Sequence, residues 1–113
     1  MIDKNLIREN LKDYDKTVIA QITDMFISEY PERFAEIQSS INNLDFAGIS
    51  HNARSSKGVR AFLSPVVVEL ARKLELLGKN GSTDGLQPAF EMLKTGILEL
   101  VEALKEMRSE YDR

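Results

Sequence analysis

The apolar residues of this 113-residue chain recur every three or four positions, and this spacing favours helices almost everywhere. The spacing is cleanest near the C-terminus, in a series that steps alternately by four and three residues: Leu86, Phe90, Leu93, Ile97, Leu100, Leu104 and Met107. Residues spaced in this way form one stripe along a helix. Such a stripe predicts a long helix packed at about 20° against its neighbours.

Capping and helix-breaking residues divide the rest of the chain. The helices expected from them are a short one after Asp3, one over 16–30, one over 31–42, one over 46–63 and one over 65–78. Proline suits the first turn of a helix, which predicts new helices at Pro31 and Pro65. Asp45 and Ser64 are the expected N-caps, and Gly78 is expected to close the helix that Pro65 begins.

The chain is expected to form one domain over residues 1–113. The predicted fold is all-α: an up-down four-helix bundle with one or two short additional N-terminal helices. The net charge of −3 comes without a basic stripe, which argues against binding to nucleic acid. No apolar run approaches the roughly 18 residues that span a bilayer, and the first residues lack a signal-peptide core. A cytoplasmic protein without a membrane partner is therefore expected, and Met1 favours a separate protein over an excised domain.

His51 is the only histidine, and its neighbours on the predicted helix are informative. At about 100° per residue, the residues within about 60° of it are small or cationic: Ala47, Gly48, Arg54, Ser55 and Gly58. A separate apolar stripe is expected to face the core: Phe46, Ile49, Ala53 and Val59. His51 is therefore predicted to project from the bundle, where a partner can reach it.

A lone histidine in a helix is most often a surface residue with no special task. Two glycines inside this helix favour a functional role for His51, since each glycine costs the helix about 1 kcal/mol relative to alanine. Keeping both Gly48 and Gly58 close to His51 indicates that another backbone approaches there.

The chemistry of His51 follows by elimination. A metal site needs several ligands, but the chain has no second histidine and no cysteine, and the nearest acids are distant in sequence. A hydrolase triad could recruit Ser55, but no acid at helical spacing completes it. Neutral imidazole is a nucleophile, and Arg54 offers donors to phosphate oxygens. These residues therefore indicate that His51 accepts a phosphoryl group. The glycine-rich segment 78–85 does not match a phosphate-binding loop and is interpreted as a linker.

Residues 45–78 resemble the histidine-containing phosphotransfer (HPt) domain of two-component phosphorelays. In that family a four-helix bundle presents one histidine, followed three and four residues later by lysine and glycine. In this chain His51 is followed by Arg54 and Ser55 at those positions, then by Ser56 and the small residue Gly58. Arg54 keeps the positive charge of the lysine. Ser55 departs further, because it replaces a glycine that lets a partner close over the histidine.

The resemblance implies a phosphoryl carrier that has no ATP site and is not itself an enzyme. Its implied partners are the receiver domains of response regulators and a hybrid sensor kinase. No cofactor of its own is expected, because the magnesium ion belongs to the receiver. The resemblance also implies a monomer.

The implied roles divide the residues around His51 into two groups. Arg54, Ser55 and Lys57 would stabilise the phosphoryl group on His51. The residues that would dock the partner are Ala47, Gly48, Gly58 and Phe62. Two of these assignments have an equally good alternative, since Lys57 could be a solvated surface lysine and Phe62 could pack against the following helix.

Two other functions stay open at this point. A helical adaptor could bind a receiver domain or a partner helix without accepting phosphate, and Ser55 in the glycine position motivates this alternative. A structural bundle could instead self-associate through the stripe of the last helix.

Overall fold

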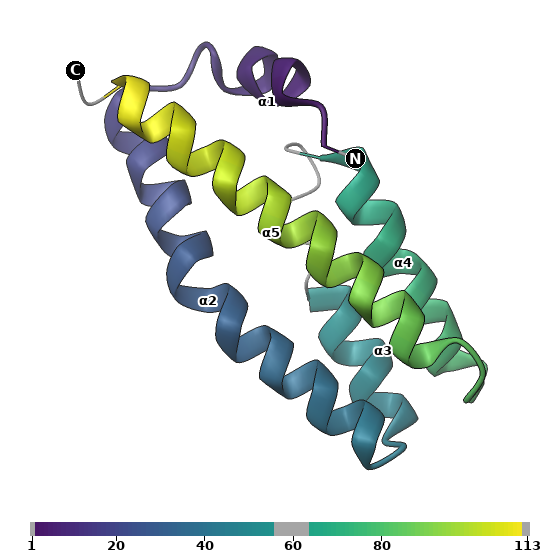
Figure 1. The fold of residues 1–113 in the computed structure, drawn as a ribbon. Helices are drawn as coiled ribbons and strands as arrows, with labels where there is room; N and C mark the ends of the chain where they lie inside the picture. The colour runs from purple at the N-terminus through teal and green to yellow at the C-terminus, as the bar shows by residue number, and fades with distance from the viewer. Residues whose placement is uncertain (1, 56–63, 112–113) are drawn as a thin grey trace.

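The computed structural model describes residues 2–55 and 64–111, and no strand occurs in these ranges (Figure 1). The helices are α1 (Lys4–Leu11), α2 (Lys16–Asn42), α3 (Phe46–Ser55), α4 (Pro65–Lys79) and α5 (Leu86–Tyr111). The prediction of an all-α fold is confirmed. The expected continuation of the histidine-bearing helix over 56–63 lies outside the described residues. Within the described ranges, no helix combines the length and apolar character that a membrane span requires.

The helix expected after Asp3 is present, and the predicted N-cap Ser64 is confirmed. The Asp3 carboxylate accepts hydrogen bonds from the backbone amides of Asn5 and Leu6 at the start of α1. The Ser64 hydroxyl accepts from the Val67 amide at 3.3 Å, and Pro65 occupies the first turn of α4. In each case a side-chain oxygen satisfies an amide that has no partner inside its own helix.

The predicted break between residues 30 and 31 is wrong, because α2 continues through Pro31 as one helix. Buried residues lie on both sides of the proline, with Ile19 and Phe26 before it and Ile37 and Ile41 after it. Packing of the whole helix therefore favours continuity. Pro31 itself is exposed, so water can hydrate the carbonyl group that proline leaves without an intrahelical partner.

Gly78 does not close α4 as predicted. The helix continues to Lys79, and the amide of the C-cap residue Asn80 donates to the Leu76 carbonyl group. Gly78 is buried inside the last turn. The glycines of the following loop have positive φ values, of 61° at Gly81 and 80° at Gly85, which suits glycine in a turn.

The core forms along α5, which packs against both α2 and α4, while α3 packs against α2 and α4 (Figure 1). All residues of the predicted C-terminal stripe are buried, with at most 2% of their surface exposed. The prediction of that stripe is confirmed. This packing fixes α3 and α4 side by side, which matters for the site below.

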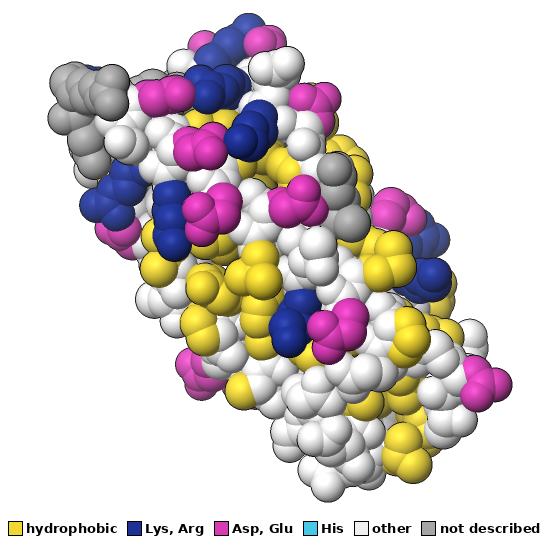
Figure 2. All heavy atoms as spheres, viewed as in Figure 1, with side chains coloured by type: hydrophobic (Ala, Val, Ile, Leu, Met, Phe, Trp, Pro, Cys, Tyr) yellow, Lys and Arg dark blue, Asp and Glu magenta, His cyan; other side chains and the backbone are white. Residues whose placement is uncertain are grey.

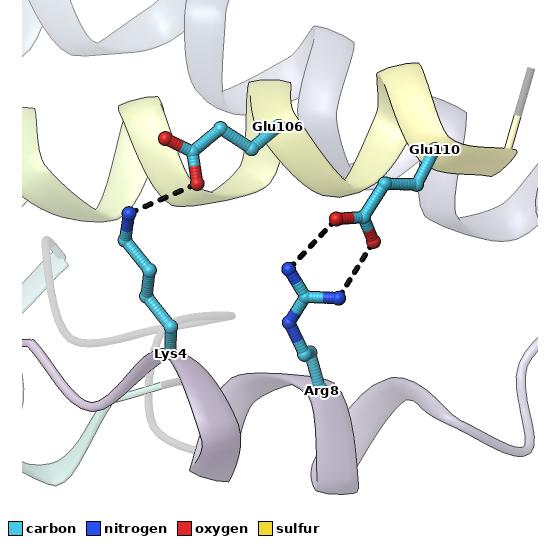
Figure 3. A network of polar contacts seen from close by, with 4 residues as sticks. All are labelled: Lys4, Arg8, Glu106 and Glu110. Atoms are coloured by element: carbon cyan, nitrogen blue, oxygen red, sulfur yellow. Dashed lines mark hydrogen bonds and ion pairs between the residues drawn. The ribbon is translucent and has the colours of Figure 1, made fainter.

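Two ion pairs join helix α1 to the C-terminal part of α5 (Figure 3), and two apolar residues of α1 belong to the core. Ile7 and Leu11 have no exposed surface. Lys4 Nζ lies 2.9 Å from a Glu106 carboxylate oxygen, and Arg8 makes two bonds of 2.6 and 2.8 Å to Glu110. Charged side chains of both signs mingle over this end of the molecule (Figure 2).

We expect Arg8→Ala to lower the free energy of unfolding by about 0.5 kcal/mol, because exposed ion pairs contribute little even in good geometry. Urea unfolding at low and high salt measures the effect, and the loss should shrink as salt screens the charges. Lys12→Ala is the matched control, since Lys12, the residue that follows α1, pairs with Glu9 of the same helix and not with α5. A loss that salt leaves unchanged would instead assign the effect to packing of the arginine stem.

Candidate functional site

Asp45 fixes the start of α3. Its Oδ1 accepts a hydrogen bond of 3.0 Å from the Gly48 amide, as its predicted role as N-cap requires. A Cβ at Gly48 would lie 2.8 Å from Asp45 Cγ and 2.8 Å from the Ser40 hydroxyl oxygen. The missing side chain of Gly48 is therefore explained by packing inside the protein, around the cap and α2.

The two sides of α3 differ as predicted. Ile49 and Ala53 have no exposed surface, and Phe46 is partly buried against the core. Asn52 donates to the Ser40 hydroxyl at 3.3 Å, which ties α3 to α2. His51 is exposed, and it is not visible on the α5 face shown in Figure 2. The imidazole therefore stands on a helix that is fixed on its other side.

His51 lines a surface hollow of about 470 Å³ between α3 and the end of α4. The lining residues from α3 are Phe46, Ala47, Ser50, His51 and Arg54, and those from α4 are Gly78 and Lys79. Apart from His51 and two cations, the lining therefore consists of small residues and one aromatic ring. Two cations border it, one from each helix.

Gly78 allows the two helices to approach closely at this hollow. A Cβ on Gly78 would lie 2.8 Å from the Ser50 backbone nitrogen and 3.0 Å from the Phe46 carbonyl oxygen. The first distance is shorter than real Cβ contacts, the second is tighter than most of them, and backbone atoms cannot rotate away. The hollow therefore depends on glycine at this position.

The two cations share one buried carboxylate. Glu75 on α4 is 3% exposed, and its Oε2 lies 2.9 Å from Arg54 Nε and 3.6 Å from Lys79 Nζ. The side chains of Arg54 and Lys79 are 62% and 48% exposed. Two cations against one carboxylate leave a net positive charge beside the imidazole. This arrangement suits an anion that arrives from solvent.

No family model matches the chain, and comparisons with curated proteins and with solved structures find no match either. The interpretation of the site therefore depends on its own geometry. Among the described residues, no three histidine, aspartate or glutamate side chains lie close enough together to hold a metal ion.

Only some of the predicted site residues lie at the hollow. Ala47 and Arg54 line the hollow with His51, whereas Gly48 faces Asp45 and Ser40. Ser55 is the last residue of α3. Three predicted residues lie outside the described ranges: Lys57, Gly58 and Phe62.

Three residues of α4 at this site were not predicted from the sequence: Glu75, Gly78 and Lys79. One signal was available in the sequence. Glu75 belongs to the buried series Ala71, Leu74, Glu75 and Gly78, whose spacing is that of a core stripe. A carboxylate in such a stripe needs a partner, and Lys79 follows it by four residues.

Proposed function

We propose that this chain is a histidine phosphotransfer protein, which relays a phosphoryl group between receiver-domain aspartates through a phosphohistidine at His51. The observation that carries the proposal is the exposed imidazole of His51 in a hollow bordered by Arg54 and Lys79. A nucleophile that solvent and partners can reach, next to two cations, is what acceptance of a phosphoryl group requires. In this proposal α2 to α5 form the up-down four-helix bundle of an HPt domain.

The transfer itself needs little from this chain beyond position and charge. The unprotonated imidazole nitrogen attacks the phosphorus of a receiver's aspartyl phosphate. A P–N bond forms while the P–O bond breaks, and the aspartate carboxylate leaves with the electrons of that bond. Arg54 and Lys79 offset the added negative charge. The reverse step then passes the phosphoryl group to the aspartate of a second receiver.

The proposal assigns the remaining machinery to the partners. A hybrid sensor kinase supplies the first receiver, and response regulators supply the second. The magnesium ion is held by the receiver, so the chain acts as a carrier and not as an enzyme with its own ATP site. The proposal also takes the chain to be a cytoplasmic monomer, with one phosphoryl-accepting histidine per chain.

The relay is tested with a receiver domain that carries a labelled aspartyl phosphate, in the presence of magnesium. We expect the label to move from the receiver to the chain, and then to leave it when a second, unphosphorylated receiver is added. Gel separation of the proteins measures both steps. A chain that binds the receiver but never takes the label would be an adaptor, and the proposal would be wrong.

A further inference from the structure

Glu75 is the one charged side chain among the buried residues of the described ranges. Burying a carboxylate is costly unless cations and hydrogen bonds compensate for the lost water. A glutamate that solvent does not reach, at the edge of a solvent-exposed site, therefore calls for an explanation. Glu75 does not line the hollow beside His51, but Arg54 and Lys79, which pair with it, both do.

The contacts of Glu75 constrain how Arg54 is presented. Arg54 donates to Oε2 through Nε, at 2.9 Å. A guanidinium has five N–H donors in one plane, and among the described residues only the Nε of Arg54 has a hydrogen-bond partner. The bond at Nε restrains the orientation of this plane, and the terminal Nη groups remain as donors for a second anion.

Lys79 is held by the same oxygen from the other helix. Its Nζ lies 3.6 Å from Oε2, one helical turn after Glu75. Long exposed side chains lose conformational entropy when an anion orders them, and a fixed anchor reduces that cost. One carboxylate therefore holds two cations at one rim while leaving their exposed ends to solvent.

We propose that Glu75 is a positioning residue for phosphoryl transfer: it holds Arg54 and Lys79 at the rim of the His51 hollow, ready for the incoming phosphoryl group. This inference rests on the proposed function of His51. For the rate of phosphoryl capture, a positioning role of Glu75 and a purely electrostatic role predict opposite changes when its charge is removed. Removing the Glu75 charge raises the local positive charge, which by itself would speed the capture of a dianion, whereas loss of positioning slows it.

The test uses phosphoramidate, which phosphorylates histidine without a partner protein. The P–N bond of phosphoramidate breaks, a new P–N bond forms at the imidazole, and ammonia leaves. Intact mass measures the rate of labelling. We expect labelling to slow by about tenfold in Glu75→Leu, and by about threefold in Glu75→Gln, whose side-chain oxygen still accepts from Arg54 Nε. Glu69→Gln is the matched control, because Glu69 lies on the same helix and is 71% exposed.

A double variant, Arg54→Ala with Lys79→Ala, separates positioning from a purely structural role. If Glu75 acts through the two cations, then adding Glu75→Leu to the double variant should not slow labelling further. Thermal unfolding of each variant is measured in parallel. If Glu75→Leu does not fold, the same comparison is made with Glu75→Gln.

Two results would overturn the inference: labelling of the Glu75 variants at or above the wild-type rate, or an equal slowing when both cations are absent. Either result leaves the proposed function intact so long as the label still depends on His51. Labelling of His51→Gln at the wild-type rate would instead remove the proposed function. The two failures are therefore distinguishable.

Discussion

Replacing His51 with glutamine is expected to abolish phosphorylation of the chain, both by a phosphorylated receiver and by phosphoramidate. His51 is the only histidine in the sequence, so no second imidazole can substitute for it. Glutamine keeps a polar side chain of similar length but has no nucleophilic nitrogen. Its amide nitrogen shares its lone pair with the carbonyl group. Intact mass after phosphoramidate treatment measures the loss directly.

The bond to phosphorus gives a second criterion for the same prediction. Phosphohistidine is hydrolysed in mild acid, whereas phosphoserine and phosphothreonine survive it. We expect the label on the wild-type chain to disappear in mild acid and to persist in mild alkali. Label that withstands acid would place the phosphoryl group on a hydroxyl, and the assignment to His51 would be wrong.

The matched control is Lys73→Gln, because Lys73 is exposed on α4 and does not line the hollow beside His51. It receives the same new side chain as His51→Gln, so any general effect of glutamine on the surface appears in both. We expect Lys73→Gln to label at the wild-type rate and His51→Gln not at all. Equal labelling of the two variants would contradict the prediction.

The features that were predictable from sequence are those set by local rules. The C-terminal stripe, the N-caps Asp45 and Ser64, and the buried face of α3 follow from residue spacing and from side-chain hydrogen bonds within a few residues. The exposure of His51 is also predictable from a local rule. Its angular separation from Ile49 and Ala53 already places it away from the core.

The features that were missed depend on contacts between helices. Pro31 was expected to begin a new helix, but burial of Phe26 and Ile37 on either side of it favours a continuous one. The relative register of α3 and α4 brings Glu75 to Arg54, across 21 positions of the sequence. No local rule gives that register. The prediction of a helix end at Gly78 is wrong for the same reason. The role of Gly78 depends on the backbone of α3, which no local rule places beside it.

Gly78→Ala is expected to lower the free energy of unfolding by about 2 kcal/mol, although alanine is the better helix former by about 1 kcal/mol. The new Cβ would lie 2.8 Å from the Ser50 backbone nitrogen and 3.0 Å from the Phe46 carbonyl oxygen. These are backbone atoms, so relief requires α3 and α4 to move apart. Urea unfolding followed by circular dichroism measures the change.

Separating the helices should also weaken the site, because α3 carries His51 and Arg54 while α4 carries Glu75 and Lys79. We therefore expect Gly78→Ala to slow labelling by phosphoramidate under conditions where the variant is still folded. Lys73→Ala, at an exposed position of the same helix, controls for the effect of alanine on α4 itself and should change neither quantity much. A Gly78→Ala protein as stable as the wild type, or more stable, would mean that α3 and α4 do not meet as closely as described. The shared anchoring of Arg54 and Lys79 by Glu75 would then lose its geometric basis.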